Sequence, residues 1–274
     1  MKLENYILNY ELIQNYNQPL ILFLHGFMGR MEEFDTVTKV LKDDFSYLLI
    51  DLPGHGKTQV LGGNEYYTIQ KTATAIIELI EKLKINQCYL VGYSMGGRLA
   101  LYLTLHFPQY FSRVILESAS PGLATETERT ERINSDHQIA KKLSRCLSQA
   151  DFSLFLSNWY RQPIFGSLQH HPEFQYMLEN RLQNNPLELA KSLKFMGNGS
   201  QPSLWEILPQ NQVPLLLLVG EYDEKFVQIN QNMAQLCPVA QLQIISNATH
   251  NIHWENTSEF VHHLQCFLQQ SSMF

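Results

Sequence analysis

The sequence of residues 88–106 is CYLVGYSMGGRLALYLTLH. It opens with the apolar run Cys88–Val91, which is typical of a buried strand, and closes with the helical pattern Met95–His106. Between them lies Gly92-Tyr93-Ser94-Met95-Gly96, a Gly-x-Ser-x-Gly sequence. In a sharp strand-to-helix turn the glycines relieve crowding, while the serine hydroxyl stands above the sheet at a helix N-terminus. The stretch therefore predicts a reactive serine, Ser94, on such a turn.

The rest of the chain alternates strand and helix patterns in the same way. Five further apolar runs predict buried strands: Leu20–Leu24, Tyr47–Ile50, Val114–Leu116, Leu215–Val219 and Leu242–Ile245. Helical patterns lie between or after several of them: Ile69–Leu83, Met95–His106 and Phe260–Leu268. This alternation predicts an α/β fold with a mostly parallel, doubly wound sheet. We expect Tyr6–Ile13 to add an antiparallel edge hairpin with Leu20–Leu24.

The alternation stops between about Ala119 and Gln210. This stretch is polar and rich in Arg, Gln and Asn, and it is helical in pattern, for example in Gln138–Leu147 and Phe152–Trp159. It is too long for a single crossover connection. We therefore expect residues 119–210 to form a helical cap inserted into a core of residues 1–118 and 211–274. Ordinary crossover helices are the alternative.

Composition narrows the class of protein. A chain of 274 residues with 45% hydrophobic residues is expected to build one large domain around a real core. A net charge of −6 disfavours general affinity for nucleic acid or anionic membranes. The N-terminus lacks the pattern of a secretory signal, and the longest strongly apolar stretch, Val213–Val219, is far shorter than the about 20 residues that span a bilayer. We expect a soluble, cytoplasmic protein.

The four cysteines are scattered along the chain. No two have the Cys-x-x-Cys spacing of a zinc or redox site, and disulfides are rare in the cytoplasm. We expect buried, reduced thiols and no metal site at Cys88, Cys146, Cys237 and Cys266.

A serine needs an imidazole partner to react at neutral pH. In folds with this elbow the chain order is Ser, then Asp or Glu, then His. Asp223 follows the run Leu215–Val219, and His250 follows Leu242–Ile245, so both lie at the strand ends where such sheets place their sites. Nearby competitors are Glu221, Glu224 and His253. We favour His250 as the base because it comes sooner after its strand.

The segment His25-Gly26-Phe27-Met28-Gly29 follows the run Leu20–Leu24. A loop of this kind supplies one backbone N–H to an oxyanion hole, and the residue after the nucleophile supplies the other. The expected donors are Phe27 and Met95. We interpret Asp51-Leu52-Pro53-Gly54-His55-Gly56 as a structural loop beside the site.

Taken together, these motifs resemble the α/β-hydrolase superfamily over nearly the whole chain. A narrower resemblance links the chain to the 2-succinyl-6-hydroxy-2,4-cyclohexadiene-1-carboxylate synthases. It is carried by Gly92-Tyr93-Ser94-Met95-Gly96-Gly97-Arg98, Ser120-Pro121-Gly122-Leu123, Trp159-Tyr160-Arg161-Gln162-Pro163-Ile164-Phe165 and Glu221-Tyr222-Asp223-Glu224-Lys225-Phe226. The family places its acid three residues after the strand-ending glycine, which favours Asp223. The sequence departs from the superfamily at Thr249, where glycine commonly precedes the histidine.

The resemblance implies a lyase of menaquinone or phylloquinone biosynthesis that eliminates pyruvate from 2-succinyl-5-enolpyruvyl-6-hydroxy-3-cyclohexene-1-carboxylate. Ser94 is then expected to act as a base assisted by His250 and Asp223. The N–H groups of Phe27 and Met95 are expected to hold the charge that develops on the succinyl carbonyl. The resemblance implies no cofactor and no metal.

This substrate carries three carboxylates, and arginine binds carboxylate through two parallel hydrogen bonds. Arg98 comes one helical turn after Ser94 and so is expected at the pocket floor. The resemblance also implies that Arg132 and Arg181 of the cap bind substrate, and that Tyr93 and Trp159 are pocket aromatics. We expect solvated positions for Arg129, Arg145 and Arg161.

Two other functions are compatible with the motifs. A serine hydrolase could use the same residues on a carboxylated ester, a thioester or a C–C dienone substrate, although clustered arginines disfavour simple esters. A non-catalytic binding protein of this fold has no need for a complete Ser, Asp and His set. The sequence does not fix the oligomeric state.

Overall fold

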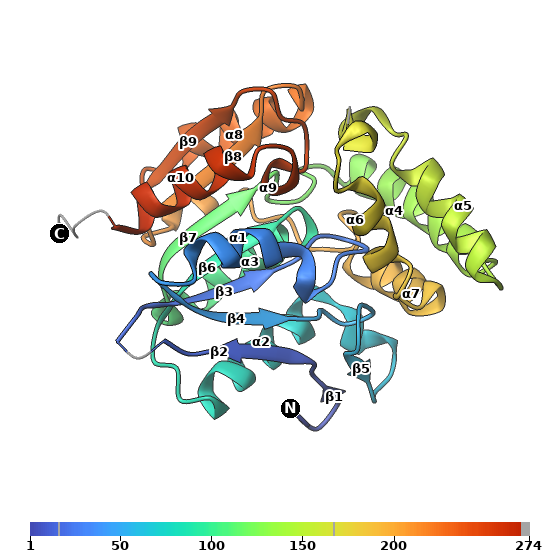
Figure 1. The fold of residues 1–274 in the computed structure, drawn as a ribbon, viewed down its shortest axis with the longest axis horizontal. Helices are drawn as coiled ribbons and strands as arrows, with labels where there is room; N and C mark the ends of the chain where they lie inside the picture. Colours follow the sequence, from blue (N-terminus) through green and yellow to red (C-terminus); the bar gives the residue numbers. More distant parts are fainter. Residues whose placement is uncertain (16, 167, 270–274) are drawn as a thin grey trace.

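A computed structural model describes residues 1–15, 17–166 and 168–269. Its main sheet has seven strands: β2 (Tyr10–Ile13), β3 (Leu20–Leu24), β4 (Ser46–Ile50), β6 (Cys88–Tyr93), β7 (Phe111–Glu117), β8 (Leu215–Gly220) and β9 (Ala240–Ile245). Their order across the sheet is β2-β4-β3-β6-β7-β8-β9, and only β2 runs antiparallel to its neighbour (Figure 1). The α/β fold and the six apolar strands expected from the sequence are confirmed.

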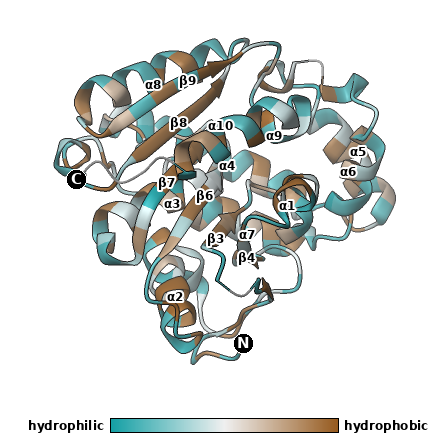
Figure 2. Cartoon of the chain, turned by 60° about the vertical axis from the view of Figure 1, so that its left-hand side comes forward, coloured by the Kyte–Doolittle hydropathy of each residue, from teal (hydrophilic) through white to brown (hydrophobic). Residues whose placement is uncertain are grey.

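Helices cover both faces of this sheet. One hydrophobic cluster joins the strands to α2 (Ile69–Lys82), α3 (Met95–His106) and α8 (Glu224–Leu236). The other cluster joins them to α1 (Asp35–Leu41), α9 (Ile252–Glu255) and α10 (Thr257–Gln269). Figure 2 shows hydrophobic residues concentrated on the central strands. Burial on both faces explains why these strands read as continuous apolar runs.

The N-terminal segment differs from the expected hairpin. β2 pairs with β4 and not with Leu20–Leu24, while β1 (Tyr6–Ile7) pairs with β5 (Gln59–Val60) in a separate two-stranded sheet. The reason is that β3 already has β4 on one side and β6 on the other, so it has no free edge. The predicted antiparallel edge strand therefore exists, but the prediction that it pairs with Leu20–Leu24 was wrong.

Four helices separate β7 from β8 along the chain: α4 (Glu126–Leu143), α5 (Gln149–Trp159), α6 (Phe174–Arg181) and α7 (Pro186–Met196). They lie together beside the ends toward which the parallel strands point (Figure 1). A third hydrophobic cluster holds them to one another and to Met28 and Trp254 of the sheet-bearing part. The helices α4 to α7, called the roof helices below, therefore cover the edge of the sheet where the polar loops emerge.

One predicted helix in this roof has different bounds. Helix α4 ends at Leu143, so the prediction Gln138–Leu147 was wrong about both ends. The helix begins earlier because Thr125 and Glu128 form a capping box, each side chain accepting from the other's backbone N–H. Thr-x-x-Glu is visible in the sequence and predicts this start. The pattern Phe152–Trp159 lies inside α5, as expected.

The cysteines agree with the expectation only in part. All four are unpaired, but Cys146 is half-buried and Cys266 is exposed, while Cys88 and Cys237 are buried. The exposed side of α10 explains Cys266, because only one face of that helix packs on the sheet. Within the described ranges, no helix is both long and apolar enough to cross a membrane.

Candidate active site

Ser94 occupies a strained turn between β6 and α3. Its φ of 49° and ψ of −105° lie where residues with a side chain rarely settle. A Cβ on Gly96 would come within 2.1 Å of the Leu24 carbonyl oxygen, and one on Gly92 within 2.5 Å of the Gly96 carbonyl oxygen. Only glycine fits either position, so the spacing of the motif follows from the packing of the turn.

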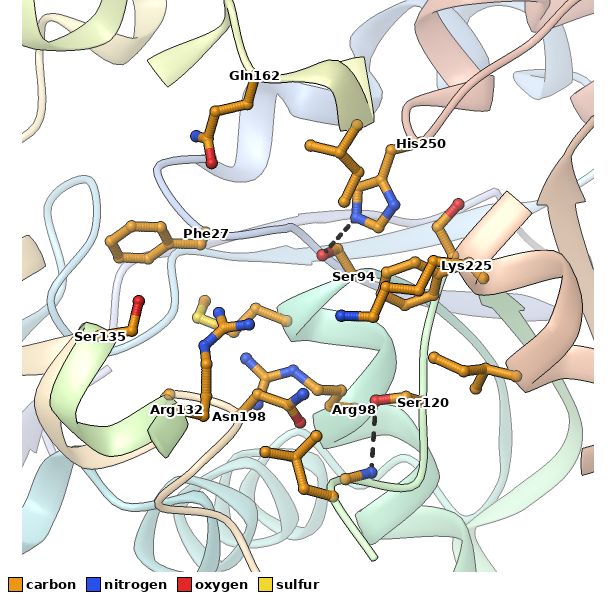
Figure 3. Close-up of a pocket in the computed structure, with 18 of the residues that line it drawn as sticks. Phe27, Ser94, Arg98, Ser120, Arg132, Ser135, Gln162, Asn198, Lys225 and His250 are labelled. Carbon is orange, nitrogen blue, oxygen red and sulfur yellow. Dashed lines mark hydrogen bonds between the residues drawn. The ribbon is translucent and has the colours of Figure 1, made fainter. Parts of the chain in front are cut away.

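The side chains of Ser94, His250 and Asp223 meet above this turn, and Figure 3 shows His250 beside Ser94. The Nδ1 atom of His250 lies 2.6 Å from Asp223 Oδ2, and its Nε2 atom lies 2.9 Å from Ser94 Oγ. A carboxylate can only accept, so Nδ1–H donates to Asp223 and neutral Nε2 accepts from the serine hydroxyl. His250 and Asp223 are each 4% exposed. The arrangement can therefore move a proton between Ser94 and His250 away from bulk water.

The alternatives raised by the sequence lie elsewhere. Glu221 is exposed and accepts from the backbone of Asn247, while exposed Glu224 begins α8. His253 is buried against Glu117, at 2.7 Å from Nδ1 to Oε2. The geometry thus selects Asp223 and His250 as the partners of Ser94.

The threonine before His250 is accommodated without strain at its own backbone. Among the described residues of this loop, positive φ occurs at Asn247, at 56°, and not at Thr249. Thr249 is tied to Glu255, which accepts from its hydroxyl at 2.7 Å and also from its N–H. The left-handed residue of this loop is therefore Asn247, two residues before Thr249.

The two expected oxyanion donors border the pocket above Ser94. Within the described part of the chain, neither the Phe27 nor the Met95 N–H donates to another protein group. The Phe27 loop is held by two buried histidines: His55 Nε2 accepts from Met28 N–H at 3.1 Å, and His25 Nε2 accepts from Leu52 N–H at 3.0 Å. Burial lowers the pKa of both imidazoles, which keeps them neutral acceptors. Both N–H groups remain available to a developing oxyanion.

A cavity of about 900 Å³ opens above these groups. Its walls come from the turn between β6 and α3, the loop after β3 that contains Phe27, α8 and the roof helices. Its charged lining residues are Arg98, Arg132, Arg181, Lys225, Glu128 and Glu131. Cations thus outnumber carboxylates on the wall, which suits an anionic ligand.

Arg98 is a buried cation without a carboxylate partner in the described residues. Its Nη1 donates to the Met196 carbonyl oxygen at 3.1 Å and to the side-chain oxygen of Gln201. Burial and the nearby Arg132 lower its pKa to about 9 although Asp136 acts in the opposite direction, so Arg98 keeps its charge at neutral pH at an electrostatic cost. A bound carboxylate would relieve that cost.

The two arginines expected from the cap are already paired. Arg132 Nε lies 2.7 Å from Asp136 Oδ1, and its side chain is partly exposed at the pocket wall. Arg181 is buried and donates to Glu33, and its Nε donates to the Tyr160 hydroxyl at 3.0 Å. Both side chains reach the pocket, but Arg181 has much of its donor capacity committed to protein groups.

The expected aromatic residues also line the pocket. The Tyr93 ring lies 5.6 Å from the His250 ring, and the half-buried Trp159 ring lies 5.8 Å from that of Phe27. Their rings give the pocket that holds Ser94 an aromatic part of its lining.

Several pocket residues were missed by the sequence reasoning: Lys225, Gln162, Ser135 and Asn198. Figure 3 shows Lys225 reaching into the same space as Arg98 and Arg132. It is the second residue of α8, whose N-cap is Asp223, so its place follows from that of the triad acid. Lys225 and Gln162 both lie in the sequence runs that carry the family resemblance, and this was the signal that could have found them. Ser135 and Asn198 had no sequence pattern that marked them.

Within the described ranges, no group of three or more His, Cys, Asp or Glu side chains could hold a metal ion.

Comparison with known proteins gives a consistent picture. Residues 19–257 match the family model described as alpha/beta hydrolase fold. A Bacillus subtilis (strain 168) protein provisionally named as a 2-succinyl-6-hydroxy-2,4-cyclohexadiene-1-carboxylate synthase is 37% identical over 88% of this chain and 86% of its own. A protein of Enterobacter sp. (strain 638) named as that synthase is 33% identical over 87% of both chains. The solved structure of MenH from S. aureus superposes with a TM-score of 0.87 at 36% identity, covering 97% of this chain and 98% of that one.

Proposed function

Because the chain belongs to the 2-succinyl-6-hydroxy-2,4-cyclohexadiene-1-carboxylate synthases of the α/β-hydrolase fold, we propose that it is a pyruvate-eliminating lyase. Its substrate is 2-succinyl-5-enolpyruvyl-6-hydroxy-3-cyclohexene-1-carboxylate, in menaquinone or phylloquinone biosynthesis. One observation best supports this reaction. The cavity above the hydrogen-bonded Ser94, His250 and Asp223 also contains a buried cation, Arg98, with no carboxylate within 4 Å among the described residues. A general ester hydrolase has no use for that cation.

The triad acts here as a proton relay. Ser94 Oγ removes a ring proton of the substrate as its own proton passes to His250 Nε2. The electron pair of the broken C–H bond forms a ring double bond, and the C–O bond to the enolpyruvyl group breaks. The imidazolium of His250 then returns its proton to the departing enolpyruvate, which becomes pyruvate. Asp223 stabilises the imidazolium and fixes its orientation at 2.6 Å.

Negative charge spreads onto the succinyl carbonyl during proton removal. The N–H groups of Phe27 and Met95 have no protein acceptor in the described residues, so they are free to bind that oxygen. Donors fixed in advance cost little reorganisation at the moment of reaction. Met95 also begins α3, whose N-terminal dipole favours an anion.

Cations bind the three carboxylates of the substrate. Arg98 and Lys225 have no carboxylate partner within 4 Å among the described residues, while Arg132 retains donors beyond its bond to Asp136. Tyr93 and Trp159 pack against the ring of the substrate. Arg181 also lines this pocket, but Glu33 balances most of its positive charge.

Residues 119–210 serve as the cap of this site, and residues 1–118 and 211–274 form the core. The helices α4 to α7 support that division because a third hydrophobic cluster, most of whose members lie in residues 119–210, packs them together. The segment also reaches the base directly, since the Ile164 carbonyl oxygen accepts from the His250 N–H at 3.3 Å. A roof over Ser94 excludes water that would otherwise hydrolyse or quench intermediates. We place this reaction in the cytoplasm, on a freely diffusing small molecule.

Release of pyruvate tests this function. Purified protein is given freshly made substrate, and pyruvate is followed by a coupled lactate dehydrogenase assay. Rapid release above the spontaneous rate, dependent on Ser94, is the expected result. Release at the spontaneous rate by folded protein would overturn the proposal and leave hydrolysis of a carboxylated ester, thioester or C–C dienone as the function to screen.

Replacing Lys225 with methionine should weaken substrate binding more than turnover. Lys225 is exposed at the pocket wall, so its pairing with a carboxylate is partly screened and is worth about 1 kcal/mol. We expect KM to rise about 3- to 5-fold with kcat nearly unchanged, because binding is lost equally from ground and transition states. Steady-state kinetics at low and high salt measures both constants.

Lys39→Met is the matched control, since Lys39 is an exposed lysine of α1 that does not line the pocket. An unchanged KM in Lys225→Met, or an equal rise in the control, would remove Lys225 from the carboxylate site.

A further inference from the structure

Four ionisable side chains form a buried row behind the pocket wall: Arg181 of α6, Glu33 in the short helix Met31–Phe34, His253 of α9 and Glu117 at the end of β7. Each side chain is at most 3% exposed. The elimination described above uses neither carboxylate and does not use His253. Burying four charges is costly, so their presence calls for an explanation.

The row is continuous from the roof to the sheet. Arg181 Nη2 donates to Glu33 Oε1, and that oxygen lies 3.5 Å from His253 Nε2, an ion-pair distance. His253 Nδ1–H donates to Glu117 Oε2 at 2.7 Å, and the His253 backbone N–H donates to Glu117 Oε1 at 3.0 Å. Glu117 therefore holds both the ring and the main chain of His253.

The charges alternate along the row. Burial by itself would lower the pKa of His253, but Glu117 and Glu33 outweigh it and raise that pKa to about 9. Burial likewise opposes ionisation of Glu33, yet Arg181 and His253 hold its pKa below the ordinary range. At neutral pH the row contains two cations and two anions, each beside an opposite charge. Removing one member leaves a neighbour buried without compensation.

One end of the row touches a catalytic group directly. The Glu117 carbonyl oxygen accepts from the Ser94 N–H at 2.8 Å, and His253 lies in α9, three residues after His250 in the loop that precedes this helix. The Tyr93 ring lies 4.9 Å from the His253 ring and 5.6 Å from the His250 ring. Arg181, at the other end, donates to the Tyr160 hydroxyl, and the Tyr160 ring lies 4.8 Å from the Phe165 ring, which lies 6.2 Å from the His250 ring.

We propose that the row Arg181–Glu33–His253–Glu117 positions the base: it fixes the loop that carries His250 over Ser94 and links that placement to the seating of helix α6. Glu33, His253 and Glu117 are thus positioning residues, since none touches the reacting atoms. The inference rests on the proposed function for its activity assay, but its structural claim does not.

Replacing Glu33 with glutamine is the sharpest test. The amide keeps the shape and an acceptor for Arg181 but removes one of the two carboxylates that face His253. We expect kcat for pyruvate release to fall about 10-fold, with KM within about 2-fold of wild type, because Glu33 contacts none of Arg98, Arg132 and Lys225. Glu117→Gln removes the other carboxylate and should act in the same direction.

The pH profile separates positioning from simple loss of stability. A raised pKa means that the favourable charge of His253 is present at lower pH and is lost as the pH rises through about 9. Wild-type kcat should therefore decline near that pH, and the decline should begin at least about one pH unit lower in Glu33→Gln. Other titratable groups near the row are Tyr93, Tyr160, His25, His55, His250 and Glu255. Of these, Tyr93 and Tyr160 have pKa values raised by burial and do not titrate in this window.

Nitrogen-15 NMR of labelled histidines gives a readout that needs no substrate. His253 should appear as an imidazolium at neutral pH in the wild type. In Glu33→Gln it should lose its proton at a lower pH than in the wild type. The His250 Nδ1–H resonance should shift in the same variant, because its loop is released. Glu259→Gln is the matched control: it removes a carboxylate 3.6 Å from the histidine ring of His263, on the half-exposed side of α10, and should change neither kcat nor these resonances.

The proposal would be overturned if kcat fell while both the pH of its alkaline decline and the His250 resonances stayed as in the wild type. An unchanged kcat in Glu33→Gln would also overturn it. If Glu33→Gln does not fold, Glu117→Gln provides the same comparison. Wild-type protein that releases no pyruvate would reject the proposed function, while the NMR titration would still decide whether the row controls His250.

Discussion

Ser94→Ala is expected to lower kcat for pyruvate release by at least about 1,000-fold, equivalent to about 4 kcal/mol of transition-state stabilisation. The hydroxyl oxygen at 2.9 Å from His250 Nε2 is the atom that takes the ring proton, and a methyl group cannot do so. Removing it leaves the cations and the two N–H donors in place. KM should therefore change little, and some rate above the uncatalysed reaction should remain.

Single-turnover and steady-state pyruvate release measure this effect, with circular dichroism to confirm folding. Labelling by an uncharged fluorophosphonate reports independently on serine reactivity and should be lost in the same variant. Ser120→Ala is the matched control, because that hydroxyl lines the same pocket but accepts from Gly122 and does not contact His250. Turnover near the wild-type rate in Ser94→Ala would exclude Ser94 as the base and leave His250 to act directly.

Arg98→Met is expected to lower kcat/KM for the tricarboxylate about 100- to 1,000-fold, or about 3–4 kcal/mol. Arg98 lies on α3 one turn after Ser94 and is only 9% exposed, so a carboxylate bound there is largely desolvated. Methionine matches the length of the stem but offers no donor. Lysine should rescue only part of the loss, since it cannot form two parallel hydrogen bonds.

The fluorophosphonate probe separates binding from reactivity in this case. Its labelling rate should persist in Arg98→Met because the probe carries no carboxylate, while pyruvate release falls. Arg145→Met, an exposed arginine that does not line the pocket, should leave both unchanged. If pyruvate release in Arg98→Met stayed within a few fold of wild type, the substrate carboxylate would have to bind to the other pocket cations, Arg132, Lys225 and Arg181.

The inferred positioning row changes how the cap arginines are understood. Arg132 and Arg181 were expected to have the same role, but their surroundings differ. Arg132 is partly exposed beside Asp136, whereas Arg181 is buried against Glu33. Loss of Arg181 is therefore expected to disturb the placement of His250 as well as the charge of the pocket.

Much of the fold could be predicted because it depends on local patterns. Continuous apolar runs marked six of the strands, and the bounds of Leu20–Leu24 and Met95–His106 match the structure at both ends. The helix α8, between Asp223 and β9, was not predicted: most of its residues are polar, and its apolar face is recognisable only once the sheet provides a surface to bury it. The edge strand Tyr10–Ile13 was predicted, but its partner depended on which strand had a free edge.

The sequence by itself determined the elbow, because a serine at positive φ between close-packed chains demands glycine at fixed spacings around it. It also determined the order of serine, acid and base, since each residue follows a strand that ends at the same edge of the sheet. Only the tertiary structure decided which histidine faces Ser94, which arginine is already paired, and that Lys225 enters the pocket. Those outcomes depend on burial and on charges contributed by residues far apart in the chain, and neither leaves a local pattern in the sequence.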